Sequence, residues 1–371
     1  MARRSEFGQD RPSDPSTPVR QELPVAHQRN WGRKIASGVF TILMVVLVVV
    51  VIPQMTSANP GDALSLITVG SVVVTQLLGL AHLAANWWVT TISLPGLSMA
   101  QAGVVGLSGA VVSNTFPSGG AVATGLTYAI DHSWGFQPDA ITASIFTNAV
   151  FAQLMRYGLL AVGLVGFAAI EQSSWKLDLV AVIVAALVGG AVTVLALVLR
   201  SERFARRVGG FFNRVAKRPL RLVHRGPVDT VDTVVSFRVK LSGLVAQRWK
   251  PLTGSSLVSQ LTSVLTLGVA LRLMGVSQST VGWFQVLVAV EGAAIAAMFI
   301  PTPGGLGVTE AALLALLSYN VPVSHDTAIL AAVILYRAAT WLQSTVLGIP
   351  AYLTWRHRQS WRRPSPPVST A

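Results

Sequence analysis

Four ionisable residues lie within long apolar stretches of this 371-residue chain: Arg156, Glu291, Glu310 and Arg337. If such a stretch crosses a bilayer, a charge at its centre costs a few kcal/mol, so each residue should face an opposite charge or a polar cavity. Two roles are consistent with this cost. Either Glu310 and Arg337 neutralise each other as a structural pair, or the arginines bind an anionic group such as a lipid phosphate while the glutamates balance or relay charge.

Glycine and proline interrupt two of the apolar stretches, at residues 114–120 and 301–307. Non-helical backbone at membrane depth is stable only where it is buried in protein or lines a water-filled cavity. A helix that restarts near Val308 would direct free N–H groups into the second break, which is a typical anion site. The alternative is a surface loop between helices. The candidate binding residues at the breaks are Gly119, Gly120, Pro303, Gly304, Gly305 and Gly307.

The composition indicates that these residues lie in membrane helices. The chain is 52% hydrophobic and 12% charged, with a mean hydropathy of +0.58, whereas a soluble chain carries roughly a quarter charged residues. The uncharged runs approach the ~20 residues that a helix needs to cross the hydrocarbon core, and they are too continuously apolar for barrel strands. The chain has no cysteine, which excludes disulfides, thiolate catalysis and cysteine-based metal sites. We predict an all-α polytopic membrane protein.

Basic residues flank the apolar runs in three segments. Residues 1–34 contain seven Lys or Arg, residues 200–250 contain thirteen and residues 356–371 contain four, which is 24 of the 28 in the chain. Cytoplasmic loops of membrane proteins show this bias. The sequence therefore predicts a disordered arm (1–34), a basic loop (200–250) and a tail (356–371), all on the cytoplasmic side of the inner membrane. The net charge of +13 then requires no nucleic-acid partner.

About six full spans connect these segments. The first membrane half, 35–199, and the second, 251–355, contain the predicted spans Ile35–Ile52, Ala63–Ser93, Ala140–Ile170, Leu179–Leu199, Leu252–Met274 and Thr327–Thr354. Because the three basic segments share one side, each broken run must begin and end on the same side. We therefore expect two re-entrant helical hairpins, 97–130 opening from the cytoplasm and 281–319 opening from outside.

The two broken runs are related to each other. Residues 118–124 read Ser-Gly-Gly-Ala-Val-Ala-Thr and residues 303–309 read Pro-Gly-Gly-Leu-Gly-Val-Thr, which align without gaps. A lone arginine follows each break within the next full span, Arg156 in the first half and Arg337 in the second. Span, hairpin and span thus occur twice in opposite orientations. This order predicts the inverted-topology repeat of secondary transporters, whose substrate sites form at broken helices near the bilayer midplane.

No complete catalytic arrangement is present, and we do not expect an enzyme. The pairs His82/Asn86 and Gly106/Ser108 resemble elements of rhomboid proteases. Such a protease needs a general-base histidine on a later span to take the serine proton. The later histidines all fall in predicted loops or the tail. We also predict no cofactor and no metal.

A family resemblance adds to this interpretation. Residues 300–314, Ile-Pro-Thr-Pro-Gly-Gly-Leu-Gly-Val-Thr-Glu-Ala-Ala-Leu-Leu, closely resemble the signature of the lysylphosphatidylglycerol synthase transmembrane region, or flippase-like, family. Leu335-Tyr-Arg337 followed by Gly348 resembles its closing span, and residues 116–120 occupy its earlier Pro-Gly break. The resemblance covers most of residues 35–355. The family usually has an acidic residue after the glycine of the first break, where this chain has Ala121.

The resemblance implies a lipid-translocating membrane domain. In the full multiple peptide resistance factor a soluble aminoacyltransferase domain follows, whereas this chain ends shortly after its last predicted span, so that synthase activity is not expected. We expect a flippase-like protein that moves a phospholipid or lipid-linked anionic substrate, with membrane phospholipids as partners. The alternative is a membrane scaffold or lipid-binding partner of a separately encoded lipid-modifying enzyme.

Overall fold

The structure is a computed structural model that describes residues 58–116, 119–170, scattered positions within 179–207, 230–300, 302–358 and Trp361. The side chains of residues 230–247 are not described. The predicted arm, the span Ile35–Ile52, and most of the span Leu179–Leu199 and of the basic loop lie outside the described residues. So do Pro117, Ser118 and Pro301.

The described part of the chain is helical and contains no strand. Its helices are α2 (Pro60–Ser65), α3 (Val69–Ser93), α4 (Met99–Thr115), α5 (Gly119–Ser133), α6 (Pro138–Ile170), α9 (Thr230–Leu273), α10 (Trp283–Phe299), α11 (Val308–Leu317), α12 (Asp326–Arg337) and α13 (Gln343–His357), with short helical turns η1 (Pro303–Gly305), η2 (Val323–His325) and η3 (Ala338–Leu342). The predicted span Ala63–Ser93 is two helices, because Thr68 and Ser71 form a capping box that starts α3.

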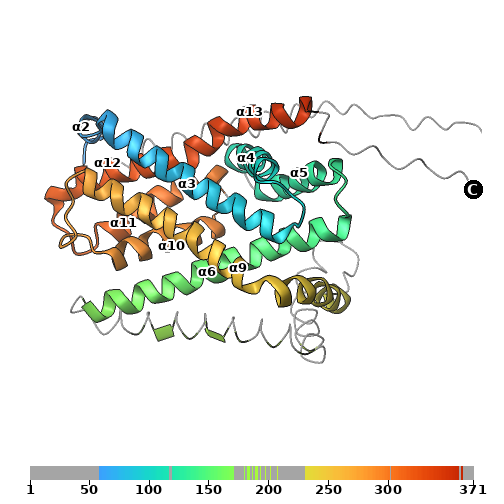
Figure 1. Ribbon diagram of the computed structural model, residues 1–371. Helices are drawn as coiled ribbons and strands as arrows, with labels where there is room; N and C mark the ends of the chain where they lie inside the picture. The colour runs from blue at the N-terminus through green and yellow to red at the C-terminus, as the bar shows by residue number, and fades with distance from the viewer. Residues whose placement is uncertain are drawn as a thin grey trace, which may run out of the picture.

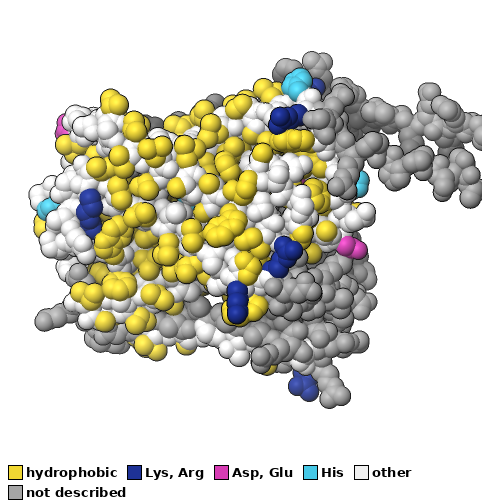
Figure 2. All heavy atoms as spheres, viewed as in Figure 1, with side chains coloured by type: hydrophobic (Ala, Val, Ile, Leu, Met, Phe, Trp, Pro, Cys, Tyr) yellow, Lys and Arg dark blue, Asp and Glu magenta, His cyan; other side chains and the backbone are white. Residues whose placement is uncertain are grey.

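Four described helical segments are long and apolar enough to cross a membrane: Val69–Ser93, Pro138–Ile170, Arg248–Leu273 and Val323–His357. They correspond to the second, third, fifth and sixth predicted spans. Large hydrophobic side chains such as Val69, Leu77 and Ile349 are more than half exposed along them. Figure 2 shows a face on which hydrophobic side chains predominate and charged ones are sparse. The chain is therefore a helical membrane protein, while the total of six spans remains a prediction.

Helices α3 and α9 pack along each other through the centre of the molecule (Figure 1). They run antiparallel, since Arg248 of α9 donates to the carbonyl of Ile92 near the end of α3 (3.3 Å), whereas the earlier α3 residue His82 contacts the carbonyl of the later α9 residue Ser259 (2.8 Å). The stretch of α9 from residue 255 to residue 266 is rich in buried polar side chains. It carries Ser255, Ser256, Ser259, Gln260, Ser263 and Thr266.

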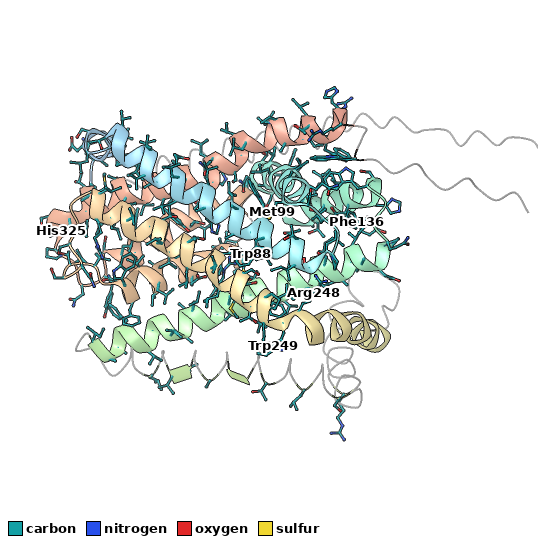
Figure 3. All side chains as sticks on the ribbon, viewed as in Figure 1. Trp88, Met99, Phe136, Arg248, Trp249 and His325 are labelled. Carbon is teal, nitrogen blue, oxygen red and sulfur yellow. The ribbon has the colours of Figure 1, made fainter. Side chains whose placement is uncertain are left out.

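The two helix pairs beside this centre begin and end at opposite ends of the molecule. Leu97 before α4 and Ile130 near the end of α5 share one buried cluster with Trp134. The start of α4 and the end of α5 therefore lie at the same end of the molecule. In the pair α10–α11, the side chain of Gln285 donates to the carbonyl of Leu317 (3.1 Å). Figure 3 places Phe136, just after α5, and His325, just before α12, at the two ends.

One helix of each pair packs against a long apolar segment of the other half of the chain. Helix α4 lies against α13, and α10 lies against α6. Glycine makes both approaches possible: a Cβ on Gly348 would clash with the backbone oxygen of Leu107, and one on Gly166 would clash with the ring of Phe284. The two halves are therefore interlocked.

The contact at Gly348 provides a test of this packing. We expect Gly348→Ala to destabilise the protein by about 1–3 kcal/mol, because the added methyl group forces α13 away from the α4 backbone. Gly158→Ala is the matched control, since a Cβ at Gly158 would meet nothing within 4 Å and alanine favours a helix over glycine. Thermal unfolding in detergent measures both. Equal midpoints for the two variants would contradict the close approach.

Candidate functional site

A cavity of about 370 Å³ lies where both broken runs meet the long helices. Elements α3, α4, α6, α9, α10, α11, α12, η1 and η3 and the start of α13 all contribute to its wall. The polar or glycine lining residues are His82, Ser113, Asn114, Arg156, Gln260, Ser263, Glu291, Gly304, Thr309, Tyr336, Arg337, Thr340, Trp341 and Ser344. Of the ten residues that the sequence proposes, Arg156, Glu291, Gly304 and Arg337 therefore lie around one space.

Arg337 and Glu310 form a closed ion pair. The Nε of Arg337 lies 2.5 Å from Oε1 of Glu310, and its Nη2 donates to the carbonyl of Gly304 (3.1 Å). The other carboxylate oxygen, Oε2, accepts from the backbone N–H of Gly307 (2.7 Å). Glu310 thus caps the start of α11 and neutralises Arg337 at once. The positive end of this helix already holds an anion, the protein's own carboxylate.

Arg156 and Glu291 form a more open pair. Nε of Arg156 lies 3.5 Å from Oε2 of Glu291, which is too long for a good hydrogen bond. Arg156 also donates from Nη1 to Oε1 of Gln153 (3.1 Å). Nε of Arg156 and Oε1 of Glu291 are both buried without a hydrogen-bond partner, and the Glu291 side chain is 1% exposed. The sequence contains both residues but gives no sign that they pair.

Three glycines shape the second break. Gly304, Gly305 and Gly307 have φ values of 56°, 71° and 82°, a region that side chains with a Cβ rarely adopt. Gly304 also lies so close to the indole of Trp341 that a Cβ would clash with it. Pro303 is buried in η1 and does not line the cavity. The break is therefore a fixed turn inside the protein, as the glycine pattern predicts.

At the first break, the residue that lines the cavity is Asn114, and the two glycines do not. Its Nδ2 donates to Oγ1 of Thr345 (2.8 Å) and to Oγ of Ser344 (3.3 Å), which fixes the end of α4 on α13. Gly119 lies against the carbonyl of Val112, and Gly120 faces open space; neither lines the cavity. Sequence reasoning did not propose Asn114 as a site residue, although it is the first residue of the break at 114–120.

A π-helical turn follows Arg337 directly. Residues 338–342 form η3 between α12 and α13. Such turns are rare and often occur at functional sites because they redirect the side chains around them. Here Thr340 and Trp341 of the turn line the cavity, and the indole N–H of Trp341 is buried without a partner. Nothing in the sequence predicted the turn.

The histidine and serine of the protease-like motifs lie in different surroundings. The ring of His82 contacts the carbonyl of Ser259 (2.8 Å) and the amide of Asn86 (3.2 Å). Ser108 is buried without a hydrogen-bond partner and does not line the cavity. Among the described residues, no group of three or more His, Asp or Glu is placed to hold a metal ion.

Residues 35–348 match the model of the family described as the lysylphosphatidylglycerol synthase TM region. The chain belongs to this family. The resemblance carried by residues 300–314 is thereby confirmed, and the match includes both breaks and the four charged residues of the two ion pairs. Comparison with curated proteins gives no significant match. Membership of the lysylphosphatidylglycerol synthase TM region family associates the chain with a lipid-related role in a membrane.

Proposed function

We propose that this chain moves an anionic phospholipid or lipid-linked substrate across the membrane. The observation that carries the proposal is the polar cavity itself, in which Arg156, Arg337 and Glu291 lie where the two helix breaks meet within a layer of apolar helices. Charged groups inside a membrane face water-filled cavities or partners and mark substrate pathways. In this family, a lipid headgroup is the substrate that such a cavity would hold.

The packing supports an inverted repeat with two re-entrant hairpins. The order α3, α4–α5, α6 corresponds to α9, α10–α11, α12, and the two helix pairs open at opposite ends of the molecule. The packing is also similar in the two halves. Helix α4 of the first half packs on α13 of the second, and helix α10 of the second half packs on α6 of the first. Alternating access in such transporters moves one repeat against the other around a fixed site. The cavity at the meeting point of both breaks corresponds to this site.

The arginines retain hydrogen-bonding capacity for a phosphate. A guanidinium group carries five N–H donors, and the contacts of Arg156 and Arg337 use only part of them. Arginine binds phosphate through two parallel charge-assisted hydrogen bonds. Arg156, whose ion pair is long and whose Nε has no hydrogen-bond partner, is the more available of the two. We assign it as the main headgroup ligand and Arg337 as the second.

The orientation is a separate proposal with its own test. With both termini in the cytoplasm, Gln137 after the first hairpin is internal and Ser324 before α12 is external; both are exposed in the structure. The chain has no cysteine, so Gln137→Cys and Ser324→Cys each introduce one thiol. In intact cells an impermeant maleimide should label Ser324→Cys, and label Gln137→Cys only after lysis. Labelling of both in intact cells would contradict the topology.

Transport is distinguished from a scaffold role by reconstitution. In liposomes that contain an acyl-labelled anionic phospholipid, we expect the purified protein to expose inner-leaflet lipid to a membrane-impermeant quencher. Liposomes with no protein, and with the Gly348→Ala variant as a packing-defective control, give the background. Lipid binding without exchange between leaflets would instead support the alternative, a binding partner of a lipid-modifying enzyme. The proposal includes no catalytic step, cofactor or metal.

A further inference from the structure

A second cavity of about 320 Å³ adjoins the first along the same helices. The two share Leu83 and Gln260 in their walls. On α6, Asn148 and Ala152 line the second cavity, whereas Arg156 lines the first. Residues four apart lie on one face of a helix and are separated by about 6 Å along its axis. The second cavity is therefore about one to two helical turns from the guanidinium group of Arg156.

The second cavity has apolar walls with several polar residues among them, and it contains no charged residue. Its polar lining consists of Asn86, Thr90, Asn148, Ser256, Ser259 and Gln260. Three of these have buried polar atoms without a hydrogen-bond partner: Oδ1 of Asn148, Oγ of Ser256 and Nε2 of Gln260. Ser256 and Gln260 are 3% and 8% exposed, so their side chains are buried inside the protein. An unsatisfied buried polar group costs about 1–3 kcal/mol, so these atoms point to a ligand that pairs with them.

One wall of this cavity is aromatic. The ring of Trp87 lies against Gly106 of α4, where an added Cβ would be 3.2 Å from it, and both residues line the cavity. Figure 3 shows the neighbouring Trp88 on α3, with Arg248 and Trp249 on the adjacent part of α9. Tryptophan and arginine are typical of the membrane–water interface. On α3 the second cavity thus lies between the charged cavity and Ile92, whose carbonyl accepts from Arg248.

We propose that the two cavities hold the two parts of one headgroup, with the phosphate at Arg156 and Arg337 and an uncharged polyhydroxylated ring, a sugar or cyclitol, at Asn148, Ser256 and Gln260. The inference rests on the proposed function, because it specifies the lipid that is moved. Ring hydroxyl groups both donate and accept, as the unpaired oxygen of Asn148 and the unpaired N–H of Gln260 require. The apolar face of such a ring packs against the indole of Trp87.

Other occupants fit this cavity less well. A cationic amine needs a carboxylate, and the second cavity has none. A second phosphate needs a cation, which is equally missing from its lining. An acyl chain would leave the buried amide and hydroxyl groups unpaired, at the full cost of their desolvation. An uncharged polyol satisfies these groups without adding a charge.

Headgroup selectivity in binding tests the second cavity. Binding of phosphatidylinositol and phosphatidic acid with identical acyl chains is compared by native mass spectrometry of the solubilised protein. Wild-type protein should bind phosphatidylinositol about tenfold more tightly, the ratio expected for two hydrogen bonds of ordinary net strength. The double variant Asn148→Leu, Ser256→Ala should lose this preference and retain its affinity for phosphatidic acid.

The control is Ser255→Ala in the same helix. Ser255 is buried, but its hydroxyl donates to the carbonyl of Leu252 (3.2 Å) and it lines neither cavity. It should keep the wild-type preference. Ser256→Ala removes a buried hydroxyl that has no partner, so loss of folding is not expected, and an unchanged unfolding temperature verifies this.

Each outcome decides between the two proposals. Equal affinities for phosphatidylinositol and phosphatidic acid in the wild type, or an unchanged preference in the double variant, would overturn the polyol subsite. Translocation is measured separately in liposomes, with acyl-labelled phosphatidylinositol and acyl-labelled phosphatidic acid. A preference for phosphatidylinositol without any translocation supports the subsite and contradicts the transport function. Translocation of phosphatidic acid without a headgroup preference supports transport and overturns the subsite.

Discussion

Glu310→Ala should destabilise the protein by about 3–5 kcal/mol, the cost of leaving a buried charge without its partner. The structure gives two reasons to expect a destabilisation in the upper part of this range. The carboxylate accepts from Nε of Arg337 through one oxygen and from the N–H of Gly307 through the other. Its loss therefore leaves the arginine unpaired and the start of α11 uncapped. Unfolding temperature and monodisperse yield in detergent measure the effect.

Two further variants separate the roles of Glu310. Glu310→Gln has a single acceptor oxygen for two donors and should fall between wild type and Glu310→Ala. Asp62→Asn is the matched control, because Asp62 lies in the first turn of the exposed helix α2, where a charge is worth less than about 1 kcal/mol. If Glu310→Ala lowers the unfolding temperature as little as Asp62→Asn does, the Glu310–Arg337 pair does not stabilise the turn at the second break.

The exchanged pair Glu310→Arg, Arg337→Glu should not recover. An isolated ion pair would tolerate the exchange, but Glu310 also caps a helix start. An arginine there offers no acceptor to Gly307 and adds a positive charge to the positive end of α11. We expect the double variant to be no more stable than Glu310→Ala. Wild-type stability in this variant would indicate a simple pair with no capping role.

Arg156→Gln should reduce lipid translocation at least about tenfold, since a charge-assisted hydrogen bond contributes about 1.5–3 kcal/mol. The single variant also leaves Glu291 unpaired at 1% exposure and destabilises the protein. Arg156→Gln combined with Glu291→Gln removes both charges and should restore stability. If Arg156 binds the phosphate, this double variant remains inactive.

The comparison of stability and transport decides the role of Arg156. Unfolding temperature and translocation of an acyl-labelled anionic phospholipid are measured on the same preparations. Arg356→Gln, an exposed arginine at the end of α13, serves as the control for loss of a positive charge away from the cavity. Recovery of both stability and transport in the double variant would make Arg156 and Glu291 a structural pair only.

The sequence by itself determined that the chain is a helical membrane protein of this family. The transfer free energy of a span is a sum over ~20 consecutive residues, so spans such as Ala140–Ile170 can be recognised without knowing their neighbours. The turn at Gly304, Gly305 and Gly307 was equally local, because positive φ values select glycine wherever they occur. The lone arginines were noticeable because charge is costly in a bilayer.

Only the tertiary structure decided which of these residues meet. Arg156 pairs with Glu291 because α6 packs against α10, and Asn114 reaches α13 because α4 lies along it. These contacts join residues far apart in sequence, and they depend on which faces are brought together where glycines allow close approach, as at Gly348. The π turn after Arg337 and the uncharged second cavity have the same origin. Local patterns specify each helix, whereas the crossing of helices specifies the space between them.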